Sequence, residues 1–145
     1  NSKSIKFDKN NVLDYISNIY SAFELIIDRD ADYENIDALS MASDNVWCAG
    51  VILGNPIENW KNIDFNTLKS TLYWNDETPQ EAIIKDANPF DTLAWVINLR
   101  LSLNLNIPKG SKIITGSVIK TRSPKKGDVV TYNVGNLSET KIRLI

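Results

Sequence analysis

The chain of 145 residues contains no histidine and a single cysteine, Cys48. The lack of histidine excludes nucleophiles activated by histidine, histidine-rich zinc sites and the usual proton shuttle near neutral pH. One cysteine can form neither an internal disulfide nor a thiolate metal cage, which fits a reducing compartment and leads us to expect a cytoplasmic protein. Catalysis, if present, must use carboxylates, lysines, hydroxyls, backbone amides or a hard cation such as Mg²⁺ or Mn²⁺.

Long apolar runs and phosphate-binding loops are also absent. No apolar stretch approaches the ~20 residues that span a bilayer, and neither GxGxxG nor GxxxxGK[ST] occurs, so nucleotide chemistry is not expected. The net charge is −2, which gives no electrostatic reason to expect nucleic acid. The basic cluster between Lys120 and Lys126 is interpreted as a solvated turn rather than a phosphate-binding patch. We therefore expect neither a nucleic-acid nor a membrane partner.

What the sequence does contain is enough apolar material, 43% of its residues, for one core. No repeat, low-complexity segment or linker interrupts it, so residues 1–145 are expected to form a single domain. The first residue is Asn1 rather than methionine, which is compatible with a fragment or a processed product.

The apolar pattern predicts an α+β domain with mostly antiparallel strands and two main helices. The helices are expected over 12–20 and 88–104, the second with Asn88 as its cap and Pro89 in its first turn. A short helix is expected near 36–41. Strands are expected at 23–28, 46–53, 67–74, 81–85, 112–115, 117–120, 129–133 and 141–144, with a hairpin between the third and fourth and a turn at 54–56.

Glu24 is the first candidate for a functional residue. It stands in the apolar run Phe23–Asp28, where a buried carboxylate must be paired, neutralised or bound to a metal. The alternation of side chains along a strand also allows Glu24 to face solvent, and local pattern alone favours that alternative.

Two further candidates lie at expected strand ends. Asp44 and Asn45 precede an apolar strand and could line the mouth of a cleft, although both residue types also favour ordinary turns. Thr115-Gly116-Ser117 combines two hydroxyls with a glycine that lets backbone N–H groups approach a ligand. A bulge or a sheet corner is the alternative explanation for that glycine.

Several segments, in this order, resemble the C-terminal part of the fumarylacetoacetate hydrolase superfamily, and in particular its branch of 2-keto-4-pentenoate hydratases and 4-oxalocrotonate decarboxylases. Ser21–Glu24 is similar to a Pro-Ala-Leu-Glu strand of the family, and Ala42–Asn45 to its Val-Ala-Asp-Asn segment. The other similar segments are 51–54, 88–95 at the start of the long helix, 110–116 (Gly-Asp-Ile-Ile-Leu-Thr-Gly in the family) and 126–128 (Ala-Gly-Asp in the family).

The resemblance implies a distorted β-roll, an oligomer and a divalent ion, Mg²⁺ or Mn²⁺, that binds a small 2-oxo acid and stabilises an enolate during hydration or decarboxylation. By the same resemblance Glu24 takes the position of a metal ligand. Thr115 and Gly116 take the position of a loop beside the substrate, and Asp44 and Asn45 that of a segment near the cleft.

The chain departs from the family at its beginning. The family's first two carboxylate ligands and its acid–base lysine precede the first helix, whereas Asn1–Lys6 contains no carboxylate. The resemblance therefore implies a roll that is incomplete at its N-terminal edge, in a fragment of a lyase. The alternative is a diverged member without turnover that binds a ligand or a protein. A third reading is an unrelated β-rich module with an aromatic contact surface formed by Trp47, Trp60, Tyr73 and Trp74. An exposed strand edge would favour pairing between copies of the chain.

Overall fold

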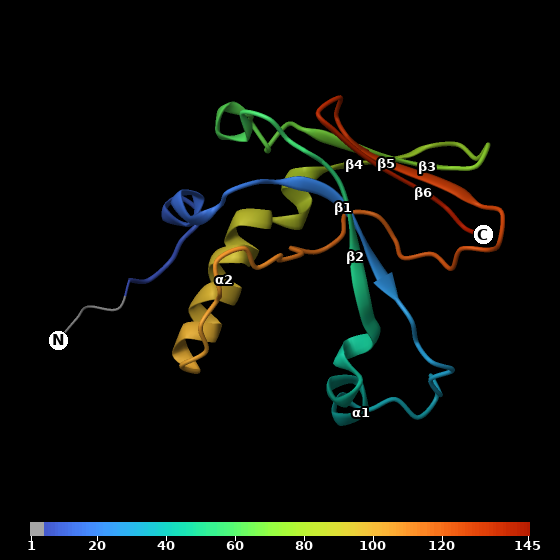
Figure 1. The fold of residues 1–145 in the computed structure, drawn as a ribbon, viewed down its shortest axis with the longest axis horizontal. Coiled ribbons are helices and arrows are strands. Elements are labelled where there is room, and N and C mark those ends of the chain that lie inside the picture. Colours follow the sequence, from blue (N-terminus) through green and yellow to red (C-terminus); the bar gives the residue numbers. More distant parts are fainter. Residues whose placement is uncertain (1–4) are drawn as a thin grey trace.

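A computed structural model describes residues 5–145, which form two antiparallel sheets and two α-helices (Figure 1). The larger sheet has the strand order β4-β3-β5-β6. Its strands are β3 (Lys69–Trp74), β4 (Gln80–Ile83), β5 (Val129–Val134) and β6 (Ser138–Arg143). Strands β1 (Tyr20–Ile26) and β2 (Cys48–Pro56) pair as a separate ribbon that leaves this sheet as an arm, with the short helix α1 (Ala38–Ser43) at its far end.

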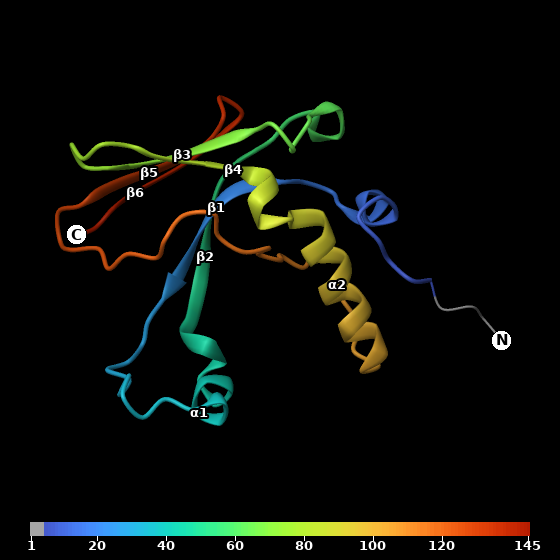
Figure 2. The same ribbon diagram turned by 180° about the vertical axis from the view of Figure 1, so that it is seen from behind.

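Helix α2 (Pro89–Ser102) projects from the molecule on the same side as the arm. Residues 103–128, the return segment, contain no helix or strand and lead from the end of α2 to β5. Figure 2 shows α2 and the first part of this return segment on the same side of the molecule. The Arg100 guanidinium donates to the Asn106 carbonyl at 3.2 Å. Four 3₁₀ turns complete the fold, at Asn11–Tyr15, Trp60–Asn62, Ile84–Ala87 and, within the arm, Asn45–Trp47.

Local sequence explains both hairpins of the larger sheet. Between β5 and β6, Gly135 takes a φ of 54°, a left-handed conformation that glycine adopts at little cost. Between β3 and β4, Asn75 has a φ of 50° and the Glu77 N–H donates to the Trp74 carbonyl at 3.0 Å. Asparagine tolerates this region better than other residues with a side chain.

The arm joins the larger sheet through a buried polar contact. The Ser21 hydroxyl on β1 lies 2.9 Å from that of Ser138 and 2.6 Å from that of Thr140, both on β6. All three side chains are buried, so their mutual hydrogen bonds replace those lost to water. The nearby hydrophobic core is small and centres on Ile57, Trp60 and Val134.

The structure confirms the α+β class, the hairpin, the long helix and the last two strands. Three local predictions are wrong. The predicted helix over 12–20 is only the 3₁₀ turn Asn11–Tyr15, because Tyr20 already pairs with β2. The segments 112–115 and 117–120 form no strand. The predicted turn at 54–56 lies inside β2. No helix among the described residues is long and apolar enough to cross a membrane.

Candidate functional site

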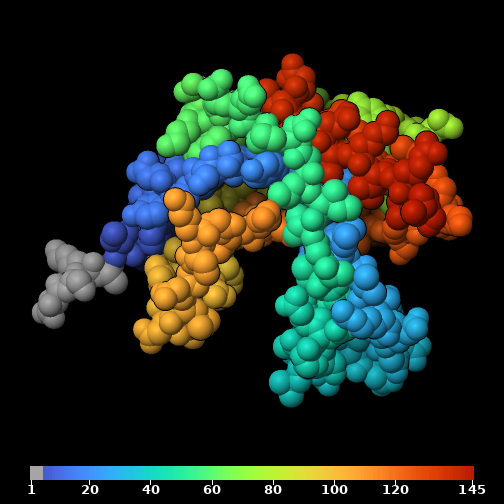
Figure 3. Space-filling view, viewed as in Figure 1, coloured from blue at the N-terminus to red at the C-terminus, as the bar shows by residue number. Residues whose placement is uncertain are grey.

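A groove of about 1310 Å³ runs between α2, the return segment and the arm. Its walls are mainly apolar, with Phe90 and Leu93 from α2 facing Leu53 from β2. The space-filling view shows the hollow between the lobe that contains α2 and the lobe that contains the arm (Figure 3). The volume exceeds the ~300–1,000 Å³ of an ordinary small-molecule site, so the groove has room for a ligand and for further protein atoms.

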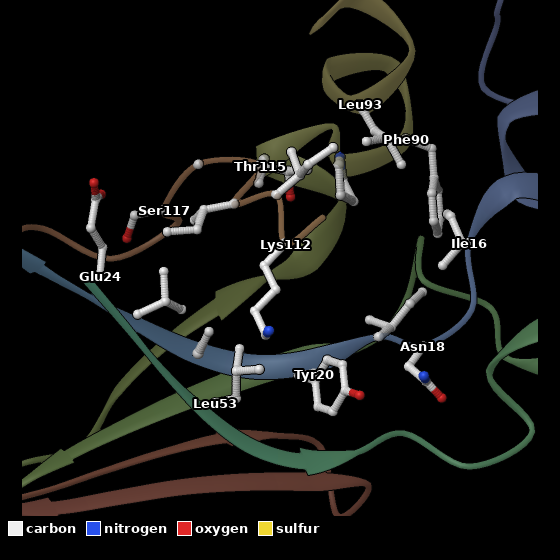
Figure 4. A pocket seen from close by; sticks show the side chains of 18 of the residues that line it. Ile16, Asn18, Tyr20, Glu24, Leu53, Phe90, Leu93, Lys112, Thr115 and Ser117 are labelled. Carbon is white, nitrogen blue, oxygen red and sulfur yellow. The ribbon is translucent and has the colours of Figure 1, made fainter. Parts of the chain in front are cut away.

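Glu24 lies on the wall of this groove that β1 provides. Its backbone pairs with Val51 of β2, and its side chain is exposed. The second half of β1 is not buried as predicted, since Leu25 and Ile26 are exposed as well. Glu24 is therefore a solvated carboxylate at the edge of the groove (Figure 4).

Thr115 and Gly116 lie on the return segment and line the same groove. Gly116 has a φ of 101°, which a residue with a side chain rarely adopts. A Cβ atom built on Gly116 meets no other atom within 4 Å, so space is open in front of this backbone. The glycine is needed for its conformation, and no other atom fills the space where a side chain would stand.

Asp44 and Asn45 lie elsewhere, at the far end of the arm. Neither is among the described residues that line the groove. Asp44 pairs with Arg29 across the end of the arm, and the Asn45 side-chain amide donates to the Cys48 carbonyl at 3.4 Å. The structure thus brings Glu24, Thr115 and Gly116 to one groove and leaves Asp44 and Asn45 outside it.

The basic character of the groove was missed in the sequence. Four cationic residues of the return segment line it: Lys109, Lys112, Lys120 and Arg122. Glu24 is the only acidic residue among its described lining residues. The sequence signal for Lys112 is slight, a single charged residue directly before Ile113-Ile114. The side of the groove formed by this segment therefore attracts anions in a chain whose net charge is −2.

Arg122 anchors the return segment to the tip of the β3–β4 hairpin. Its guanidinium makes two 2.8 Å contacts with the Glu77 carboxylate and lies 4.1 Å from the centre of the Trp74 ring. The hydrogen bonds from Arg122 hold the pKa of Glu77 below its usual value. The bidentate pair and the stacked ring together fix one orientation of the guanidinium.

Asp128 completes this anchor. Its carboxylate accepts from the Lys125 backbone N–H at 2.8 Å, from the Asn75 amide at 2.8 Å and from the Trp74 indole at 3.1 Å. These hydrogen bonds, that of the Lys125 backbone first, lower the pKa of Asp128. The Asp128 N–H donates to the Lys125 carbonyl at 3.0 Å, so Lys125–Asp128 forms a turn that holds the end of the return segment.

The described residues do not by themselves fit a divalent-metal site. Among residues 5–145, no group of three histidine, cysteine, aspartate or glutamate side chains is arranged to hold a metal ion. Glu24 offers one carboxylate, whereas Ca²⁺ takes six to eight oxygen ligands and Mg²⁺ needs a near-octahedral set.

Comparison with known proteins gives relatives of one kind. No protein-family model matches the chain. It is 29% identical over 150 residues to a 2-oxo-hept-4-ene-1,7-dioate hydratase of Escherichia coli, a match that covers 96% of this chain and 54% of that protein. It is 25% identical over 141 residues to a 4-oxalocrotonate decarboxylase of Pseudomonas putida, covering 90% of this chain and 53% of the relative.

The fold matches as well. The 4-oxalocrotonate decarboxylase from Pseudomonas putida G7, solved in complex with magnesium and adipate, superimposes with a TM-score of 0.83 at 23% identity, over 95% of this chain and 53% of the other. The chain thus spans about half the length of the relatives it matches. In sequence and in fold, it matches the hydratase and decarboxylase branch of the fumarylacetoacetate hydrolase superfamily, as its motifs predicted.

Proposed function

We propose that the groove binds a small 2-oxo acid and forms one wall of the active site of a lyase, a hydratase or a decarboxylase. One observation carries the proposal. Glu24 and the Thr115-Gly116 loop come from segments about 90 residues apart in sequence, yet they line one groove whose cationic residues all come from the return segment. A groove with apolar walls and a few convergent polar groups is the usual form of a small-molecule site.

Each part of a 2-oxo acid has a suitable partner in the groove. The Thr115 hydroxyl and the Gly116 N–H are donors for a carboxylate or for an oxygen that gains negative charge. The apolar body of the acid is placed against Leu53, Phe90 and Leu93. Asp44 and Asn45 stay predicted substrate-binding residues. Because they lie outside the groove, they would bind a ligand at a separate site or a ligand held in the groove of another copy of the chain.

Glu24 is proposed as one oxygen ligand of a divalent cation, Mg²⁺ or Mn²⁺. When bound, such an ion would supply Lewis-acid stabilisation to the 2-oxygen of the acid. Support comes from the magnesium and calcium complexes of the structural relatives. Among residues 5–145, Glu24 is not joined by two further histidine, cysteine, aspartate or glutamate side chains that could hold the ion with it.

Two further parts of the proposal concern the setting of the site. The relatives are enzymes, which favours lyase activity over a binding module without turnover. We also propose that the chain is cytoplasmic, which its single cysteine supports. We propose further that it assembles with copies of itself, since apolar side chains remain exposed on α2 and on the second half of β1.

The experiment is a titration followed by amide NMR, with 2-oxohexanoate as the ligand and magnesium in the buffer. We expect saturable shifts at Thr115, Gly116 and the residues around Glu24, and at least a fivefold weaker affinity for Thr115→Val, which keeps the shape of the side chain and removes its hydroxyl. Thr131→Val makes the same change on β5, outside the lining of the groove, and is the control that should bind as the wild type does. Absence of saturable shifts in the groove would refute the proposed site.

A further inference from the structure

We infer that the free edge of β1 is an interface with a second copy of the chain, in which the two β1 strands pair antiparallel about Leu25. The inference rests on the self-assembly included in the proposed function. It goes further, because it names the strand that pairs and the register of the pairing. It does not depend on the binding of an acid in the groove.

The second half of β1 has an edge without a partner strand. Among residues 5–145, β1 pairs with β2 alone. The Ile27 N–H donates to the Trp47 carbonyl at 3.0 Å, directly before β2, so it points to the β2 side. Successive N–H groups of a strand point to opposite edges, so those of Glu24 and Ile26 point to the free edge. These backbone groups can pair with another strand.

The side chains of this edge are apolar and exposed. Leu25, Ile26 and Ile27 all reach solvent, and neither lysine nor proline, the usual protection of an edge strand, occurs in residues 20–27. Figures 1 and 2 place the second half of β1 on the side of the arm away from α2, and they place α1 at the end of β2. The free edge of β1 is thus a separate surface from the outer side of α2 and from α1.

The charges at the two ends of this edge are complementary. Residues 28–37, which follow the edge, hold five carboxylates and one arginine, whereas residues 109–126 hold six basic residues and no carboxylate. The basic segment lines the groove together with Tyr20 and Ala22, in the first half of β1. Antiparallel pairing therefore places the acidic residues of each copy near the basic segment of the other. Parallel pairing would place the two acidic segments side by side.

One register satisfies the backbone groups and the charges together. With the two-fold axis beside Leu25, Glu24 of each copy lies opposite Ile26 of the other. Two N–H groups from each copy then meet a carbonyl, which makes about four hydrogen bonds in all. Moving the axis to Ile27 would place Glu24 opposite Asp30, and like charges directly opposite each other destabilise a strand pair.

The pairing also bears on the groove. Glu24 and Ile26 line it, so a second β1 placed against their edge continues the wall that the first one forms. This agrees with a groove volume of about 1310 Å³, which leaves room for more protein than a small-molecule site needs.

The test is disulfide cross-linking by oxidised glutathione in a Cys48→Ser background, read on a non-reducing gel. Leu25→Cys should form a covalent dimer, because the Cα atoms of a non-hydrogen-bonded antiparallel pair lie about 4.5 Å apart, within the reach of a disulfide. Ile27→Cys is the matched control. Ile27 is 54% exposed against 39% for Leu25, yet in this register the two copies of residue 27 lie about 13 Å apart along the strands. We expect the dimer to form about tenfold faster from Leu25→Cys.

Ile26→Pro, added to the Leu25→Cys chain, is the second variant. Proline removes an N–H that points to the free edge and leaves the pairing with β2 intact, so cross-linking should slow about fivefold. Equal rates for Leu25→Cys and Ile27→Cys, or no effect of the proline, would overturn the β1 pairing. A mass that still rises with protein concentration in light scattering would then leave the proposed self-assembly standing through another surface. A constant monomer mass would overturn both.

Discussion

Gly54 is the residue on which the junction between the arm and the larger sheet depends most directly. A Cβ atom at Gly54 would lie 2.1 Å from the Glu139 carbonyl oxygen and 2.5 Å from the hydroxyls of Ser21 and Thr140. The backbone of β6 cannot yield without breaking its pairing with β5. We predict that Gly54→Ala lowers the free energy of unfolding by about 3 kcal/mol, the upper end of the usual cost of overpacking.

Urea unfolding measures this prediction, and Gly50→Ala is its control. Gly50 is also on β2, but a Cβ there meets no atom within 4 Å. It should change the stability by less than about 0.5 kcal/mol. Equal stability of the two variants would show that β2 does not pass so close to β6.

The same glycine shows what a sequence pattern cannot reveal about one residue. Gly54-Asn55-Pro56 is a typical turn signal, and it predicted the end of a strand. In the structure Gly54 is required because a strand distant in sequence passes against its backbone. Glu24, by contrast, was correctly placed on a strand, because the apolar run that predicts the strand is a local signal. Its exposure does not come from alternation, since Leu25 and Ile26 are exposed as well.

At the scale of elements, the return segment is held at its end by the anchor of Arg122, Glu77 and Asp128. The pKa of Glu77 is lowered from its usual value of 4.5, mainly by the hydrogen bonds from Arg122. A carboxylate with a lowered pKa stabilises the folded state fully above its unfolded pKa. This contribution is lost as the pH falls through the folded pKa.

We therefore predict that Glu77→Gln is less stable than the wild type near neutral pH and that the difference shrinks as the pH falls below about 4.5. Urea unfolding between about pH 3 and pH 7 measures both curves. Arg122→Gln should show the same pH dependence. The double variant should lose little more free energy of unfolding than either single variant, because all three variants remove the same ion pair. Additive losses would contradict a coupled anchor.

The elements that the sequence predicted well are those stabilised by local signals. The hairpin of β3 and β4 follows from its turn residues, and α2 follows from Pro89 and an apolar period. The segments 112–115 and 117–120 have the composition of strands, yet they pair with no strand. The segment that contains them is held at its end by the anchor, a contact distant in sequence that strand propensity does not encode.

At the scale of the whole molecule, the groove could be predicted only in part. The order of motifs placed Glu24, Thr115 and Gly116 near one another through the family resemblance. It also placed Asp44 and Asn45 near the cleft, but the arm carries them away from the groove. The basic lining of the groove was not predicted, because it depends on the path that the irregular return segment takes in space.

The solvent-accessible area of the molecule is larger than expected for a folded monomer of its mass. A folded monomer of 16.3 kDa is expected to expose about 7,500 Å², whereas this chain exposes 10751 Å². The excess is several times the ~800 Å² that each partner contributes to an ordinary interface.

Helix α2 is apolar on two faces: Leu93 and Ile97 line the groove, and Trp95 and Leu99 are exposed on another side. A helix that is apolar on both sides is normally covered on both.

We predict from this that the chain self-associates through the outer side of α2. The average mass measured by light scattering after gel filtration should rise with protein concentration. Trp95→Lys should weaken the association about tenfold, because an exposed tryptophan is a frequent energetic centre of an interface. Since Trp95 is 63% exposed, the fold of the single chain should survive this change. Leu39→Lys, at an 82% exposed position on α1, is the control and should associate as the wild type does. A constant monomer mass at every concentration would exclude self-association. Equal weakening by both variants would place the contact elsewhere, because only Trp95 lies on the outer side of α2.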